Sequence, residues 1–154
     1  MQTTDLLIRD FSSPLFQQAF RLYFAELGIE VRDWDGLFRE MNRGEAGEQN
    51  VSYLRLTGEG GTIGFIQFCM LPFSSWFFDA SLGFVREFWV AEPFRGKGHG
   101  SALLQLAESY FAAHGAGGSI LTSDTAQDFY VRRGYRRARS AAAKNQLPVF
   151  IKPL

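Results

Sequence analysis

A glycine-rich turn lies between two apolar segments in the second half of the chain. Residues 82–91 are largely apolar, and Gly96, Gly98 and Gly100 follow them, ahead of a helix-like apolar pattern. Because glycine tolerates backbone angles that other residues avoid, such a turn can point successive N–H groups inward. The N-terminus of the following helix adds unpaired N–H donors and a partial positive charge. The segment therefore predicts a binding site for a phosphate or pyrophosphate.

The glycine-rich segment does not match two other known phosphate-binding motifs. A Walker A loop requires Gly-Lys followed by Ser or Thr, whereas Lys97 is followed by Gly98. A dinucleotide fingerprint requires G-x-G-x-x-G after the first strand of a βαβ unit, whereas this G-x-G-x-G lies in the middle of the chain. Both of these loops are therefore excluded.

Hydrophobic periodicity and turn-forming residues predict the elements that position this turn. The expected strands span residues 4–8, 51–57, 62–71, 82–91 and 119–122, with a last hairpin of 135–137 and 148–152. The expected helices span residues 12–28, 33–41 and 100–114, and a fourth begins in a capping box of Asp124 and Gln127 and ends at Gly134. Residues 72–80 are expected to form an aromatic loop. This order predicts one α/β domain over residues 1–154, with helices around a mixed sheet.

Composition and charge exclude several classes of protein. The chain has 154 residues, of which 46% are apolar and 21% charged, and this suits an ordinary folded core. The net charge is zero, which argues against general nucleic-acid binding. No apolar run of about 18 residues is present, so no membrane span is expected, and the N-terminus lacks the pattern of a secretory signal. We therefore expect a cytoplasmic protein.

The residues that commonly bind metals or form covalent intermediates are few and scattered. Cys69 is the only cysteine and lies in an apolar run, which favours a buried thiol over a nucleophile. His99 and His114 are far apart in the sequence and no cysteine cluster accompanies them, so no metal site is expected. Five arginines lie between residues 132 and 139, where they form a solvated helix end or contact a phosphate or a partner.

The glycine turn and a second motif carry a family resemblance. Arg95, Gly98 and Gly100 match the Q/R-x-x-G-x-G/A pyrophosphate loop of the GNAT superfamily, the acetyl-CoA-dependent N-acetyltransferases. Residues 126–135, AQDFYVRRGY, resemble that family's A-x-x-F-Y-x-x-x-G-F/Y segment and follow about thirty residues later. The expected element order also agrees over nearly the whole chain. The resemblance implies a mixed, mostly antiparallel central sheet flanked by helices, with two parallel strands splayed at the CoA site.

The resemblance assigns CoA-binding roles along the strand and the turn. The N–H groups of residues 96–101 would hold the diphosphate of acetyl-CoA, and the main chain of Phe88 and Val90 would bind the pantetheine amides. A main-chain N–H near Val90 would polarise the acetyl carbonyl. Ser123 stands where many members place an asparagine that contacts pantetheine, and its hydroxyl can make one such bond. The expected cofactor-binding residues are Phe88, Trp89, Val90, Arg95, Gly96, Lys97, Gly98, His99, Gly100, Ser101, Ser123 and Phe129.

Two side chains are candidates for proton transfer. An amine attacks a thioester only when it is unprotonated, and the departing thiolate needs a proton. Glu87 is the candidate base, expected on the same strand face as Val85 and Trp89, where partial desolvation would raise its pKa. An ion pair with a nearby arginine is the alternative role for Glu87. Tyr130 is the candidate acid, because the matching tyrosine of the family lies close to the CoA sulfur; the alternative is a tyrosine that only packs beside its neighbours.

The residues expected around the acceptor are acidic and aromatic. In this family the first two helices and the loop before the central strand usually shape that site. Acidic groups beside aromatic rings suit a cationic amine. The candidate residues are Glu26, Glu30, Trp34, Phe73 and Trp76. The alternative is a solvated acidic helix face, with an aromatic loop that packs on the core or on the second subunit of a homodimer.

The resemblance thus predicts an N-acetyltransferase that moves an acetyl group from acetyl-CoA to a primary amine by direct attack in a ternary complex. A small amine or amino sugar is the favoured acceptor, and a peptide or protein amine comes next. The alternative is a non-catalytic sensor of CoA or acyl-CoA, or an interaction module on the same fold. The presence of Glu87 and Tyr130 favours the enzyme.

Overall fold

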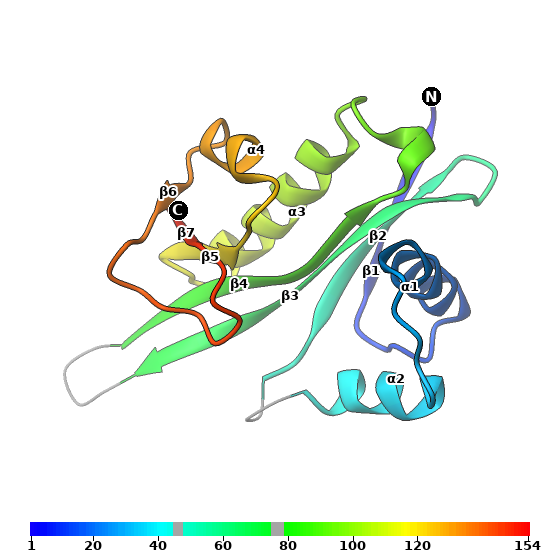
Figure 1. Cartoon of the computed structure of the whole chain (residues 1–154), viewed down its shortest axis with the longest axis horizontal. Helices are drawn as coiled ribbons and strands as arrows, with labels where there is room; N and C mark the ends of the chain where they lie inside the picture. Colours follow the sequence, from blue (N-terminus) through cyan, green and yellow to red (C-terminus); the bar gives the residue numbers. More distant parts are fainter. Residues whose placement is uncertain (45–47, 75–78) are drawn as a thin grey trace.

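The computed structural model describes residues 1–44, 48–74 and 79–154, and within them seven strands form one sheet that four α-helices flank (Figure 1). The strands are β1 Thr3–Ile8, β2 Val51–Thr57, β3 Thr62–Ser74, β4 Asp79–Val90, β5 Gly118–Thr122, β6 Arg136–Arg137 and β7 Val149–Pro153. The helices are α1 Pro14–Leu27, α2 Trp34–Arg43, α3 His99–Ala113 and α4 Gln127–Val131, and a 3-10 turn spans Glu92–Phe94. None of these helices combines the length and hydrophobicity needed to span a membrane.

The sheet is mixed and mostly antiparallel, as predicted. Its strand order is β1-β2-β3-β4-β5-β7-β6, and only β4 and β5 run parallel. These two strands pair over Leu82–Phe84 and Gly118–Ile120 and then diverge, so the rest of β4 has no partner on that edge. The predicted splay of two parallel strands is confirmed.

Each face of the sheet carries its own hydrophobic core. Helix α3 lies on one face, and α1 and α2 lie on the other (Figure 1). Phe68 and Val85 are buried in the core beneath α3. Phe16, Phe65 and Trp89 are buried in the core beneath α1 and α2. A side chain of β4 therefore reaches one of two separate environments, according to the face on which it emerges.

A β-bulge in β4 decides on which face Glu87 lies. The register shifts so that Gln67 pairs with Glu87 while Phe68 pairs with Val85, which leaves Arg86 as the extra residue. Val85 therefore packs towards α3, whereas Glu87 and Trp89 emerge on the face of α1. The prediction that Glu87 shares a face with both Val85 and Trp89 is correct for Trp89 and wrong for Val85, because the bulge interrupts the simple alternation.

The hairpin of β3 and β4 is longer than predicted. Residues 72–80 were expected as a loop, but the ladder continues through Pro72–Ser81 and Ser74–Asp79 pairs. Proline is tolerated there because β2 pairs with β3 only as far as Phe68, so this part of β3 has a free edge that needs no N–H donor.

The start of α4 also differs from the prediction. The helix begins at Gln127 with Ala126 at the N-cap position, and no described side chain caps it. The Ser123 Oγ accepts a hydrogen bond from the Ala126 N–H at 3.2 Å in the turn before the helix. The Gln127 side chain donates to the main-chain carbonyl of Asp124 at 3.2 Å. The expected capping box with Asp124 as its N-terminal residue is therefore wrong, because the helix starts later, with Ala126 at the N-cap position.

Candidate functional site

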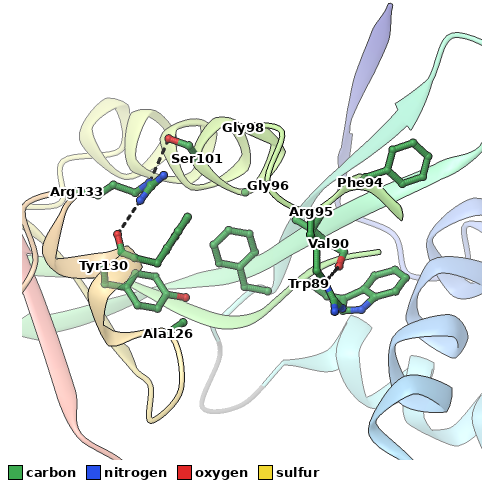
Figure 2. A pocket seen from close by; sticks show the side chains of 13 residues that line it. Trp89, Val90, Phe94, Arg95, Gly96, Gly98, Ser101, Ala126, Tyr130 and Arg133 are labelled. Atoms are coloured by element: carbon green, nitrogen blue, oxygen red, sulfur yellow. Dashed lines mark hydrogen bonds between the residues drawn. The ribbon is translucent and has the colours of Figure 1, made fainter. Parts of the chain in front are cut away.

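A cavity of about 520 Å³ opens where β4 and β5 diverge. Figure 2 shows it between α4 on one side and the end of β4 with the glycine turn on the other. It is lined by Phe88, Trp89, Val90, Phe94, Arg95, Gly96, Gly98, Gly100, Ser101, Ala126, Phe129, Tyr130 and Arg133. We call this space the splay cavity. It brings the two sequence motifs together, since Arg95 to Ser101 form one wall and Ala126 to Arg133 the other.

The glycine turn offers the splay cavity a row of free N–H groups. Among the described residues, no oxygen accepts a hydrogen bond from the N–H groups of residues 96–101. Gly98 caps α3 with a φ of 87°, a left-handed angle that favours glycine, and the space around its Cβ position is open. Free donors at the positive end of a helix are the arrangement that binds a phosphate group.

The free edge of β4 adds main-chain groups to the same cavity. The Ala91 N–H donates to Ile63 of β3 at 2.8 Å, so the polar groups of Phe88 and Val90 point to the opposite edge, away from β3. One of these groups is already used, because Arg95 Nε donates to the carbonyl of Val90 at 2.8 Å (Figure 2). The N–H of Val90 remains directed towards the gap between β4 and β5.

Arg95 also connects the start of the glycine turn to α1 through hydrogen bonds to Glu26. Its Nη2 donates to both carboxylate oxygens of Glu26, at 2.6 and 2.7 Å. Trp89 Nε1 donates to Glu26 Oε2 at 2.9 Å. The indole bond and then the guanidinium hold the pKa of Glu26 below its usual value. The carboxylate predicted to meet an acceptor is therefore engaged by two residues of the splay cavity.

Tyr130 stands on the far wall of the splay cavity. Its side chain is buried, and the hydroxyl points into the space between α4 and β4 (Figure 2). Burial raises the pKa of Tyr130 to about 12, so the hydroxyl keeps its proton at neutral pH. A neutral phenol in this position can donate a hydrogen bond or a proton into the cavity.

Arg133 lines the splay cavity as well, although it was not singled out among the five clustered arginines. Its Nε donates to Ser101 Oγ at 3.2 Å, and its Nη1 donates to the carbonyl of Phe129 at 2.8 Å (Figure 2). The guanidinium also lies 3.7 Å from the centre of the Phe129 ring. These contacts join α4 to the N-terminus of α3. Phe94 and Ala126 are further lining residues that the sequence analysis did not name.

Three predicted cofactor-binding side chains do not line the splay cavity. Lys97 is exposed, and the Ser123 hydroxyl accepts a hydrogen bond from the Ala126 N–H. The ring of His99 lies against Phe94, and Arg55 Nη1 approaches its Nδ1 at 3.3 Å. Burial and then the charge of Arg55 lower the pKa of His99. Any contact of these residues with a ligand in the cavity would therefore be made through the main chain.

A second cavity, of about 210 Å³, lies on the other face of β4 between α1 and α2, and Glu87 lines it. The Tyr23 hydroxyl donates to Glu87 Oε2 at 2.5 Å. Burial raises the pKa of Glu87, while the hydrogen bond from Tyr23 and then the charge of Arg86 oppose that rise. We call this space the α1–α2 cavity. Residues 88–90 line the splay cavity and residues 86–87 line this one, so consecutive residues of β4 border the two cavities.

Two of the remaining predicted acceptor residues, Glu30 and Trp34, line neither cavity, and the side chains of the other two are not among those that the structure describes. Glu30 is exposed just after α1. Trp34 stacks on Phe38 with ring centres 5.7 Å apart. Phe73 belongs to β3, and Trp76 lies outside the described residues. Within the described chain, no three His, Cys, Asp or Glu side chains are grouped so that they could hold a metal ion.

Known structures share this fold. One is the NatC complex bound to Gag peptide and CoA, with 17% identity, a TM-score of 0.74 and coverage of 100% of this chain and 99% of that chain. Another is Arabidopsis thaliana NAA60 in complex with acetyl-CoA, with 16% identity, a TM-score of 0.72 and coverage of 99% of both chains. A third is an aminoglycoside acetyltransferase from an uncultured soil metagenomic sample in complex with trehalose, with 15% identity, a TM-score of 0.69 and coverage of 92% of this chain and 91% of that chain.

Sequence comparison assigns the family. No curated protein sequence matches the chain. Residues 4–135, which include both motifs and all strands of the sheet except β6 and β7, match the acetyltransferase (GNAT) family. With that match over most of its length, the chain belongs to the GNAT acetyltransferase family.

Proposed function

We propose that this protein transfers an acetyl group from acetyl-CoA to a primary amine by direct attack within a ternary complex. The observation that carries the proposal is the row of unpaired N–H groups at residues 96–101, which faces a cavity between two diverging parallel strands. Structures of the same fold contain CoA or acetyl-CoA, which supports a cosubstrate of this type.

The main chain holds the cosubstrate in this proposal. The N–H groups of residues 96–101 bind the diphosphate, and the partial positive charge of the α3 N-terminus favours its negative charge. The outward main-chain groups of Phe88 bind the pantetheine amides, together with the carbonyl of Val90, which can accept a second hydrogen bond beside that of Arg95. The N–H of Val90 then donates to the acetyl carbonyl oxygen, where negative charge develops as the amine attacks.

Two side chains, Glu87 from the α1–α2 cavity and Tyr130 from the splay cavity, move the protons. Glu87 accepts a proton from the acceptor ammonium, directly or through one water, and so frees the nitrogen lone pair. The nitrogen forms a bond to the acetyl carbon and loses its second proton to solvent, and the carbon–sulfur bond breaks. Tyr130 returns a proton to the departing thiolate, and solvent restores the proton on the phenol. Cys69 is buried in β3 and does not line the splay cavity, which favours direct attack over an acyl-cysteine.

The acceptor is a small amine or an amino sugar in the first instance, and a peptide amine in the second. The fold neighbours include one structure with a peptide and one aminoglycoside acetyltransferase, so this fold serves acceptors of both kinds. The buried carboxylate of Glu87 supports an acceptor that enters as a cation.

Release of free CoA thiol from acetyl-CoA in the presence of a panel of primary amines tests the proposal. We expect thiol release that depends on the amine, together with CoA binding measured by calorimetry. CoA binding without thiol release for any amine would contradict the transferase and support a CoA sensor on the same fold. Absence of CoA binding would contradict both.

A further inference from the structure

The splay cavity contains one charged side chain that no carboxylate neutralises. Of the residues that line this cavity, only Arg95 and Arg133 are charged. Both carboxylate oxygens of Glu26 accept hydrogen bonds from Arg95. By contrast, no Asp or Glu of the described chain forms an ion pair with Arg133. The α4 wall of the cavity therefore carries a positive charge without a partner.

Most of the N–H donors of Arg133 are also free. A guanidinium has five of them. The described residues accept only from Nε, through Ser101 Oγ at 3.2 Å, and from one N–H of Nη1, through the Phe129 carbonyl at 2.8 Å. Both N–H groups of Nη2 are therefore available to a ligand. The guanidinium lies over the Phe129 ring, 3.7 Å from its centre, and this contact fixes its direction.

Arg133 lies beside the row of main-chain donors in the glycine turn. Figure 2 shows its side chain extending from α4 towards Ser101, in the first turn of α3. The Cβ position of Gly100 is only 3.6 Å from the Phe129 ring, so the two walls approach each other here. Because Ser101 Oγ accepts from Arg133, the hydrogen of that hydroxyl stays available as well. An anion on the turn would therefore be within reach of donors from both walls.

The charge of a CoA molecule requires more than main-chain donors. CoA carries a diphosphate and a further phosphate on the 3′ position of its ribose. A helix N-terminus offers only about half of one positive charge. A guanidinium supplies a full charge, and its paired N–H groups match the geometry of two phosphate oxygens.

We propose that Arg133 binds a phosphate group of the cosubstrate from the α4 wall, across from the main-chain donors of the glycine turn. This role rests on the proposed binding of acetyl-CoA, and it adds a cationic side chain to a site assigned above to the main chain. The phosphate belongs either to the diphosphate or to the 3′ position of the ribose, since the same chemistry recognises both.

Calorimetric titration of CoA tests the contact without turnover. Arg133→Gln removes the charge, so we expect CoA to bind about tenfold more weakly. Arg132→Gln is the matched control, because Arg132 is the neighbouring arginine but is exposed and does not line the splay cavity. Equal CoA affinity of the two variants would overturn the proposal.

Titration of 3′-dephospho-CoA identifies the phosphate. If Arg133→Gln weakens binding of this ligand as much as it weakens binding of CoA, Arg133 contacts the diphosphate. If the substitution affects CoA alone, Arg133 contacts the 3′-phosphate. Each of these results supports a phosphate contact.

An acetyl donor without phosphates separates this role from a structural one. S-acetylpantetheine keeps the thioester and the pantetheine amides. In Arg133→Gln we expect kcat/KM for acetyl-CoA to fall about tenfold and kcat/KM for S-acetylpantetheine to stay unchanged, as measured by thiol release. Equal falls for the two donors would mean that Arg133 only joins α4 to α3, and would overturn the proposal.

The same measurements distinguish a failure of this role from a failure of the proposed function. CoA binding by the unaltered protein without thiol release for any amine would contradict the transferase, while weaker CoA binding by Arg133→Gln than by Arg132→Gln would still support the role of Arg133. Thiol release by the unaltered protein, with Arg133→Gln equal to Arg132→Gln in CoA affinity, would overturn the role of Arg133 alone.

Discussion

The two cavities on either side of β4 are built from different parts of the chain. The splay cavity presents main-chain N–H groups of a glycine turn and a free strand edge. The α1–α2 cavity presents side chains from two helices and two strands, which are far apart in the sequence. Main-chain donors are available whatever the side chains are, whereas an amide oxygen beside a carboxylate depends on particular residues. The comparison teaches that a site of main-chain donors is set by the shape of the backbone, whereas a site of side chains is set by the identity of its residues.

The largest expected effect comes from a side chain placed in the glycine turn. Gly98→Glu puts a negative charge beside the proposed diphosphate and forces a left-handed angle on a non-glycine residue, so we expect CoA affinity to fall more than a hundredfold. Gly60→Glu is the matched control, because Gly60 has a φ of 91° and open space around its Cβ position but lies in the β2–β3 turn. Equal CoA affinity of the two variants in calorimetry would show that the main chain of the turn does not hold CoA.

Removal of the Tyr130 hydroxyl tests the proposed role of this residue as the proton donor. Tyr130→Phe deletes the proposed proton donor but keeps the buried ring, so we expect kcat to fall about a hundredfold with CoA affinity unchanged. Steady-state kinetics and calorimetry separate the two quantities. Tyr53→Phe, in a ring that packs on Phe68, serves as the control. A kcat equal to that of the unaltered protein would remove Tyr130 from the reaction.

A substitution in the α1–α2 cavity should instead alter the pH dependence of kcat/KM. The Tyr23 hydroxyl stabilises the charged form of Glu87, so Tyr23→Phe raises the pKa of that carboxyl further above its ordinary value. A base must be deprotonated to act, and activity is therefore lost as the pH falls through its pKa. We expect the acidic limb of the kcat/KM profile to move to higher pH in Tyr23→Phe. A limb that stays in place would mean that Glu87 is not the base.

The smallest effect is expected for loss of the ion pair that links α1 to the start of the glycine turn. Glu26 joins α1 to Arg95 of the splay cavity through a partly exposed ion pair, with side-chain exposures of 37% and 48%. Exposed pairs contribute little free energy, so Glu26→Gln should weaken CoA binding about threefold, and less at high salt. A loss as large as that of Gly98→Glu would show that α1 controls the shape of the glycine turn.

Much of the splay cavity could be predicted from local patterns. The glycine turn with the apolar strand before it, and the AQDFYVRRGY segment, are each contiguous in the sequence, and the left-handed angle of Gly98 is one that glycine accommodates. The fold class, the splayed strands and the family were predicted correctly from the same patterns. The roles of Glu87 and Tyr130 stay predictions until the kinetic tests are made.

The sequence by itself determined the order of the elements and the place of the glycine turn, because these depend on residues that are close together along the chain. Tertiary structure alone decided that a bulge at Arg86 turns Glu87 towards α1, that Arg95 occupies the carboxylate of Glu26, and that Gln67 faces the same cavity as Glu87. The physical reason is that strand register and the burial of a polar group are set by contacts between distant segments. Such contacts leave no periodic or local signature in the sequence.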